Sequence, residues 1–171
     1  MATQANYGQT YPNTRTRTIN PLYGVAAVGG VLLAVSSFLA WYNFNITGSG
    51  GESFSITGMG GTSGTSEMAK FLAATASNAG IISVFLGGMV LLPALLGLAL
   101  NKKGFAIATL VFALMSVAFM VLKLSQAAKL GSDLGDSAML TTSVGLGLYL
   151  GLLGAIIALV GSVLPLVMHR R

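Results

Sequence analysis

Cysteine is absent from this chain, and charged residues make up only 8% of it. The lack of thiols excludes disulfide bonds, thiolate metal sites and cysteine nucleophiles within the chain. Its single histidine, His169, lies at the C-terminal end, so the apolar segments offer no imidazole to a haem or a reaction. Soluble domains carry about 25% charged residues. Because the chain is 54% hydrophobic, with a mean hydropathy of +0.80, we expect an integral membrane protein.

Four apolar segments are long enough to cross a bilayer as helices, which takes about 20 residues. They lie at about 22–42, 79–100, 105–124 and 142–168. Residues 1–20 are polar and lack the apolar core of a signal peptide, so we expect the first segment to be retained. The sequence predicts an all-α membrane protein, a four-helix transmembrane bundle at 21–171 behind a polar cytoplasmic tail at 1–20.

Basic residues indicate how the bundle is oriented. They gather before the first span, between the second and third, and after the fourth, as Arg15 and Arg17, Lys102 and Lys103, and Arg170 and Arg171. All four acidic residues fall on the other side. The positive-inside rule predicts that both termini are cytoplasmic. We expect a multi-pass protein of a bacterial plasma membrane.

The two outer helix ends are predicted to extend beyond the bilayer. A helix that begins at Glu67 runs into the second span and gives one helix of about 35 residues, which is longer than a bilayer core is thick. The third span continues in the same way to Leu130, where Gly131 is expected to stop it.

The segment FNITGSGGESFSITG contains two copies of F-x-I-T-G around a glycine-rich turn. Its alternation of apolar and polar residues predicts an outer β-hairpin at 41–58. In this pattern Trp41 shares a face with Asn43, while the Phe-Ile pairs share the other face. We expect an outer interaction surface here, formed by Trp41, Phe44, Ile46, Phe54 and Ile56.

Two other interpretations of this segment compete with a structural hairpin. Asn45-Ile46-Thr47 matches the N-glycosylation pattern on the side predicted to be outside. The glycine run 48–51 has the composition of a phosphate loop, but it lacks the lysine and the following helix that such loops need. The structural interpretation is favoured.

Small residues recur at helix-packing spacing in the first and fourth spans, where they let helix backbones approach closely. We expect these stripes to pack helices within the monomer or to form an oligomer contact: Ala26, Gly30, Ala34, Gly147, Gly151, Gly154, Ala155 and Ala158. Pro93 lies in the middle of the second span and is expected to kink it.

The spans carry no ionisable residue in their middle, which proton relays and ion-coupled transporters usually need. The outer acidic residues, such as Glu67 and Asp133, are too few for a calcium loop. We therefore expect no catalytic residues, no cofactor site and no metal site, and the chain is not expected to be an enzyme.

Four spans, a β-rich first outer loop that starts near Trp41, and a short second outer loop resemble the plan of claudin-type tetraspan proteins. The chain lacks that family's G-L-W motif and its two loop cysteines. It also resembles small bacterial tetraspan proteins whose first span ends in Trp before a Ser/Thr-Gly-rich loop.

The combined features predict a non-catalytic assembly or accessory subunit of the membrane. Its partners are expected to be the lipid bilayer and either further copies of itself or a larger membrane complex, with no nucleic acid. The alternative is a pore or carrier for a small or apolar solute or lipid, which would need a continuous cavity between the spans.

Overall fold

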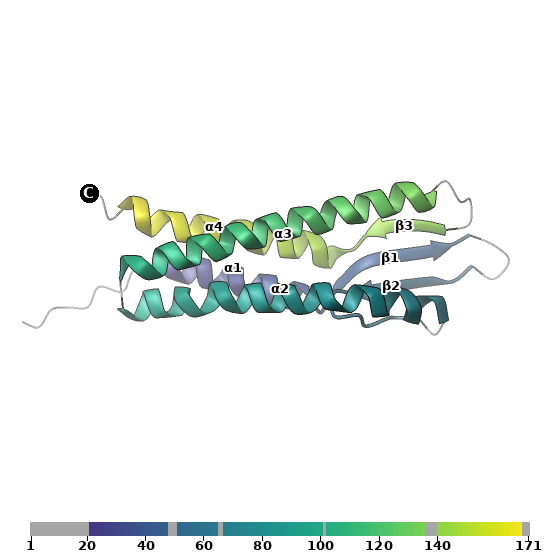
Figure 1. Ribbon diagram of the computed structural model, residues 1–171, viewed down its shortest axis with the longest axis horizontal. Helices are drawn as coiled ribbons and strands as arrows, with labels where there is room; N and C mark the ends of the chain where they lie inside the picture. Colours follow the sequence, from purple (N-terminus) through teal and green to yellow (C-terminus); the bar gives the residue numbers. More distant parts are fainter. Residues whose placement is uncertain (1–20, 48–50, 65–66, 101, 136–139, 169–171) are drawn as a thin grey trace, which may run out of the picture.

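The computed structural model describes residues 21–47, 51–64, 67–100, 102–135 and 140–168. Four helices and a three-stranded sheet make up this part of the chain (Figure 1). In chain order they are α1 (Leu22–Ser36), β1 (Ala40–Ile46), β2 (Ser53–Thr57), α2 (Glu67–Leu100), α3 (Lys103–Gly135), β3 (Leu140–Val144) and α4 (Leu146–Met168). The predicted N-terminal tail lies outside the described residues.

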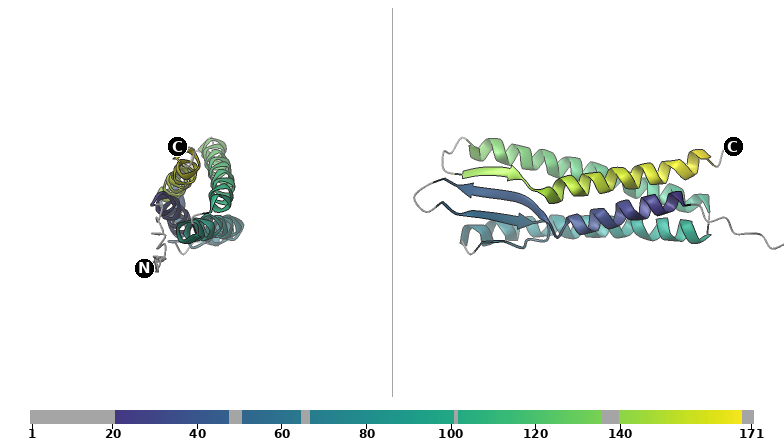
Figure 2. Two further views of the ribbon diagram at one scale, coloured as in Figure 1. Left: turned by 90° about the vertical axis from the view of Figure 1, so that its left-hand side faces the viewer. Right: turned by 180° about the vertical axis from the view of Figure 1, so that it is seen from behind.

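The elements form two layers that run along the whole molecule. The long helices α2 and α3 form one layer, and the shorter helices α1 and α4 form the other (Figure 2). The sheet continues the second layer, because β1 follows α1 and β3 leads into α4. One half of the molecule is therefore a four-helix bundle, and the other half is a sheet lying on two helices.

Three helices are long and apolar enough to cross a membrane, at Ala79–Leu100, Lys103–Leu130 and Leu146–Met168. The fourth apolar helix, α1, has only 15 residues. The expected first span at 22–42 is therefore too long, since residues 40–46 form β1. The fourth span also begins later than expected, because residues 140–144 form β3.

Helix α1 ends at Ser36 because the backbone tightens there. The N–H groups of Ser37, Phe38 and Leu39 bond to carbonyls three residues earlier, at 3.0–3.2 Å, as in a 3₁₀ turn. The Ser36 hydroxyl also turns back to the Leu33 carbonyl, at 2.7 Å. Neither glycine nor proline marks this end in the sequence, which explains why apolarity alone extends the helix too far.

The long helices that the sequence predicts, α2 and α3, are present. α2 begins at Glu67 and runs for 34 residues, as predicted. It passes through Pro93 without interruption, although proline leaves the Met89 carbonyl without its usual helix partner. α3 does not stop at Gly131 but continues to Gly135.

Adjacent glycines in α1 pack against two different helices. A Cβ on Gly29 would collide with the backbone of Ala158 in α4, while a Cβ on Gly30 would lie 2.9 Å from the Gly87 carbonyl in α2. The Gly87 contact is reciprocal, since its own Cβ would lie 2.8 Å from the Gly30 carbonyl. The pair therefore places the backbone of α1 in contact with both neighbours.

The small-residue stripes are used inside the monomer. Ala26 is buried beside Gly161, Ala34 faces Gly87, and Gly147 lies against Trp41. A Cβ on Gly151 would meet the Ser36 hydroxyl and the Met120 side chain of the same chain. The other members are buried in the same interfaces, namely Gly30, Gly154, Ala155 and Ala158. These stripes are not free to bind a second subunit.

Replacing Gly29 by Ala should lower the free energy of unfolding by about 3 kcal/mol, the upper end of the usual cost of overpacking. The added methyl group meets backbone atoms, which cannot move aside as a flexible side chain can. Gly88→Ala is the matched control: it lies in α2 with nothing within 4 Å of its Cβ, and it should be neutral or mildly stabilising. Thermal unfolding of the detergent-solubilised protein, followed by circular dichroism, measures both. Equal melting temperatures would contradict the close contact.

Candidate functional site: the outer sheet and its junction with the helices

The outer sheet has the order β2-β1-β3, with both pairs antiparallel. The predicted hairpin is confirmed, and the register places Phe44 directly opposite Phe54. Their rings stack with centroids 5.0 Å apart and an angle of 15° between planes. Such a pair adds about 0.5–1.5 kcal/mol beyond the area it buries.

The apolar face of the sheet points into the molecule. Phe44, Phe54 and Ile56 are only 2%, 4% and 1% exposed and form a cluster with Ala73 of α2, while Ile46 packs at its edge. Trp41 is fully buried. The predicted outer interaction surface is therefore an internal core, because the outer ends of α2 and α3 cover it.

The third strand, β3, which pairs with β1 along Tyr42–Ile46, was not predicted. The signal in the sequence is weak: a run of β-branched residues, Thr141-Thr142, just before Gly145. Thr142 lies on the inner face opposite Phe44, and its hydroxyl is buried without a hydrogen-bond partner. No feature of the structure explains why the Thr142 hydroxyl lacks a hydrogen-bond partner.

Trp41 lies at a bulge where β1 begins. The ladder pairs Ala40 with Thr57 and Tyr42 with Ile56, so one extra residue stands in β1 between them. A bulge of this kind redirects a side chain. This explains why Trp41 points into the core, whereas strict alternation predicts that it shares the outward face with Asn43.

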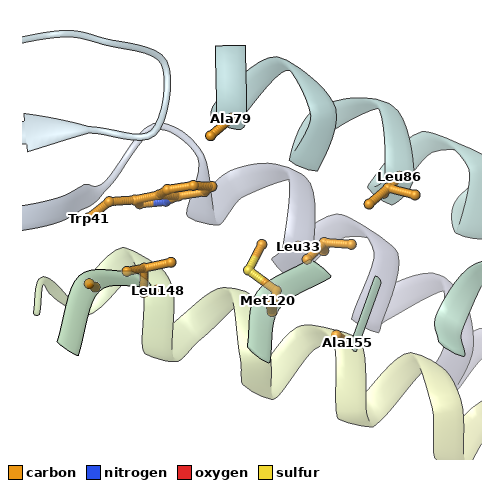
Figure 3. Packing of buried hydrophobic residues seen from close by; sticks show 8 residues of the cluster. Leu33, Trp41, Ala79, Leu86, Met120, Leu148 and Ala155 are labelled. Carbon is orange, nitrogen blue, oxygen red and sulfur yellow. The ribbon is translucent and has the colours of Figure 1, made fainter. Parts of the chain in front are cut away.

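The indole of Trp41 joins the sheet to the helices. Its Nε1–H donates to the Ser36 carbonyl at the end of α1, at 2.8 Å. Figure 3 shows the ring between Ala79 of α2 and Leu148 of α4. The Trp41 carbonyl accepts the Gly145 N–H at 2.8 Å, at the start of α4. Trp41 thus contacts three helices, namely the end of α1, the side of α2 and the start of α4.

Glycines make room for this ring. A Cβ on Gly58 would lie 2.5 Å from Cε2 of Trp41, and a Cβ on Gly147 would lie 2.6 Å from Cδ1. Gly80 of α2 in turn packs directly on the Gly58 carbonyl. Of these glycines only Gly147 was among the predicted site residues. Gly58 and Gly80 were missed because only the folded chain shows that they lie at the Trp41 ring.

The outward face of the sheet carries side chains that are polar and uncharged. We call it the polar face, and it consists of Asn43, Asn45, Ser53, Ser55, Thr57, Thr141 and Ser143. The free edge of β2 is closed by Ser63, whose hydroxyl accepts the Ser55 N–H at 2.9 Å and whose own N–H bonds to the Ser55 carbonyl. A shallow hollow of about 260 Å³ lies here, and the residues that line it are Asn43, Phe44, Asn45, Ser53, Phe54, Ser55 and Ser63.

The remaining candidates divide between described and undescribed residues. Asn45, of the glycosylation pattern, is exposed on the polar face. Most of the glycine run lies outside the described residues. In the part of the chain that the structure describes, no group of three metal-binding side chains occurs. At the inner side of the sheet, burial raises the pKa of the Tyr42 phenol.

Replacing Gly147 by Ala should displace the Trp41 ring and expose it, because the new methyl group would overlap Cδ1. Trp41 is the only tryptophan, so its fluorescence reports the junction alone. We expect a red-shifted emission and a loss of about 1–3 kcal/mol in stability. Gly104→Ala, with nothing within 4 Å of its Cβ, is the control, and an unchanged spectrum in Gly147→Ala would count against the junction.

Comparison with known protein families gives no match. Comparison with characterised proteins likewise finds no relative. The geometry of the outer sheet and of its junction is therefore the basis for a function.

Proposed function

We propose that this chain is a non-catalytic, four-span membrane subunit that packs laterally with itself or with a larger membrane complex. The observation that carries the proposal is the outer sheet, which is continuous with α1 and α4 and fixed to α2 by the Trp41 junction. A surface held in this way is ordered before a partner arrives, which lowers the entropic cost of binding.

The position of α1 supports a fourth span despite its length. At one end, the Tyr23 hydroxyl donates to the carbonyl of Lys102 in the turn between α2 and α3, at 3.4 Å. At the other end, Trp41 packs with Ala79, where the long apolar part of α2 begins. The chain from Tyr23 to Trp41 therefore covers the same height as the apolar part of α2.

The arrangement of charges favours the predicted orientation. Lys102 and Lys103 are exposed at the end of the bundle opposite the sheet. Six of the nine Lys and Arg residues belong to that end in the four-span arrangement, and the positive-inside rule makes it cytoplasmic. The plan of four spans with a β-rich outer layer is also what the claudin-type resemblance implies.

Packing inside the bundle favours an assembly role over a pore. Val90 of α2, Ala113 of α3 and Ala158 of α4 are fully buried against one another at mid-bundle. The hydroxyls of Thr109 and Ser116 bond to carbonyls of their own helix, at 2.7 and 2.8 Å. A path for a solute at this level would require the helices to separate.

Labelling of single cysteines tests the four spans, and the native chain supplies a background without thiols. In intact cells, a membrane-impermeant maleimide should label Ser143→Cys but not Pro21→Cys, which should react only after permeabilisation. Val28→Cys, midway along α1, should react in neither case. Labelling of Pro21→Cys from outside would show that α1 does not cross.

Purification from the native membrane in a mild detergent, followed by mass measurement, tests the assembly role. We expect further copies or a partner membrane protein in fixed stoichiometry, because the outer sheet is ordered for contact. Vesicles reconstituted with the chain alone should show no more solute leakage than empty vesicles. A lone monomer would contradict the proposal, and specific flux would favour a pore or carrier.

A further inference from the structure

We propose that Lys123 of α3 binds the phosphate of a lipid in the outer leaflet, at a membrane boundary that lies level with the Trp41 junction. This inference rests on the proposed four-span arrangement and deepens it, because it names a lipid-binding residue. It is carried by the level at which the exposed side chains change from apolar to polar, by the place of Lys123 at that level, and by the chemistry around its ammonium group.

The change from apolar to polar is sharp on both helices of the sheet layer. On α1 every exposed side chain from Val25 to Phe38 is apolar, and the next exposed residue along the chain is Asn45. On α4 every exposed side chain from Leu146 onward is apolar, whereas Ser143 just before it is polar. Lipid faces the apolar part and water the polar part. The boundary on this layer therefore lies between the helices and the sheet.

The exposed residues of α3 change in the same way at Lys123. From Ile107 to Leu122 the exposed side chains of this helix are all apolar. Beyond Lys123, which is half-buried, the exposed set includes Gln126 and Lys129. No break in the helix marks this point, since α3 continues to its end well beyond it. The surface of α3 therefore changes its chemistry without any change in its backbone.

Contacts across the bundle place Lys123 level with Trp41. A Cβ on Gly151 of α4 would lie 2.9 Å from Cε of Met120 in α3. Because α3 and α4 run in opposite directions, about one turn further out α3 reaches Lys123 and α4 reaches Leu148. Leu148 packs beside the Trp41 ring (Figure 3). The boundary on α3 is therefore at the same height as the boundary on α1 and α4.

The spacing of two lysines on α3 matches the thickness of a bilayer. Lys103 is exposed at the inner end of the helix, and Lys123 follows near its outer end. At about 1.5 Å per residue the helix rises about 30 Å between them. The hydrocarbon core of a bilayer is also about 30 Å thick. The flexible stem of Lys123 can therefore carry its ammonium group into the outer headgroups.

The ammonium group of Lys123 has capacity for an anion. Its Nζ donates to Oε1 of Gln126 at 3.1 Å and lies 5.8 Å from the centre of the Phe119 ring. An ammonium has three donors, so hydrogens remain for a ligand. Among the side chains that the structure describes, no carboxylate pairs with it, and the next acidic residue of α3, Asp133, is about 15 Å further along the helix. A phosphate oxygen is the strong acceptor available at this depth.

The surroundings of Lys123 suit the rest of a phospholipid. Val121 and Leu122 are exposed on its bilayer side, where acyl chains run. Exposed aromatic side chains lie near the same level on the other layer, as Phe38 just after α1 and Tyr149 in the first turn of α4. Aromatic residues are enriched at the interface between membrane and water. An acyl chain can thus contact α3 while the headgroup phosphate meets Lys123.

Quenching of Trp41 fluorescence by brominated lipids tests the boundary, since Trp41 is the only tryptophan. The full chain is reconstituted into phosphatidylcholine vesicles whose acyl chains carry bromine either close to the headgroup or close to the chain end. We expect stronger quenching by the shallow bromines, because the two positions are separated by most of a leaflet about 15 Å thick. Equal quenching, stronger quenching by the deep bromines, or none from either would overturn the inference.

Lipid retention, measured by native mass spectrometry, tests the phosphate site. With phosphatidylglycerol added in mild detergent, the unsubstituted chain should retain about fivefold more lipid than Lys123→Gln, the effect of one charge pair near a membrane surface. Lys123→Arg should retain the lipid. Lys129→Gln, which removes a lysine beyond the boundary, is the matched control and should behave as the unsubstituted chain. Equal retention by Lys123→Gln would overturn the site.

Two further probes separate a lipid phosphate from other ligands. Diacylglycerol has acyl chains but no phosphate, so the unsubstituted chain and Lys123→Gln should retain it equally. Inorganic phosphate should not displace phosphatidylglycerol, because it lacks the acyl chains. Displacement by inorganic phosphate, or a loss of diacylglycerol in Lys123→Gln, would overturn the inference. An unshifted Trp41 emission shows that the variants are folded.

The outcomes also separate this inference from the proposed function. If the labelling of Pro21→Cys shows four spans but Lys123→Gln retains phosphatidylglycerol, the inference is overturned and the four spans stand. Labelling of Pro21→Cys from outside would overturn the arrangement on which both rest. A lone monomer would contradict the assembly role alone, and shallow quenching with loss of lipid in Lys123→Gln would still support the inference.

Discussion

The outer half of the molecule depends on the burial of Trp41 against the end of α1. Helix termini leave backbone carbonyls without partners, and in an apolar environment each one is costly. The Ser36 carbonyl accepts both the Leu39 N–H and the indole Nε1–H. The same ring fills the space between Ala79 and Leu148. The interaction that ends the helix therefore also fixes the start of the sheet.

This junction divides the molecule into two sides of different chemistry. The Phe-Ile face of the sheet packs against α2 and α3, so the Asn, Ser and Thr residues of the polar face lie on the side away from these helices. The lysines of the outer half lie on the opposing helices. A lone hairpin would be marginally stable in water. Here the third strand and the two helices supply the remaining contacts, and the orientation of the polar face is set by the bundle.

Much of this architecture could be predicted from local pattern. Apolar length located α2, α3 and α4, and alternation located the hairpin and placed both Phe-Ile pairs on one face. The end of α1 was missed because residues 37–42 are largely apolar, while the turn at 37–39 and the pairing of Ala40 and Tyr42 with β2 appear only in the folded chain. The bulge at Trp41 was missed for a related reason. Alternation assigns a face to each strand residue, and only the finished ladder shows where a residue is inserted.

The candidate site was harder to predict, because a small residue does not reveal its neighbour. The stripes in α1 and α4 have the spacing of an oligomer contact, but Gly30 approaches α2 and Gly154 approaches α1 of the same chain. Likewise, an apolar hairpin face fits either a partner or the chain's own helices. The length of α2 and α3 decides between them, because both helices continue alongside the sheet and cover its apolar face.

The same contacts bear on the choice between an assembly subunit and a pore. Opening a path along the bundle axis would move α1 away from α4, against the backbone contact of Gly29 with Ala158. Since β1 and β3 are joined to those two helices and paired with each other, such a movement would also shear the ladder from Tyr42 to Ile46. It would draw Trp41 away from Gly147 as well. Separation of the helices is therefore opposed both in the helix bundle and in the sheet, which supports the proposed assembly role over the alternative of a pore or carrier.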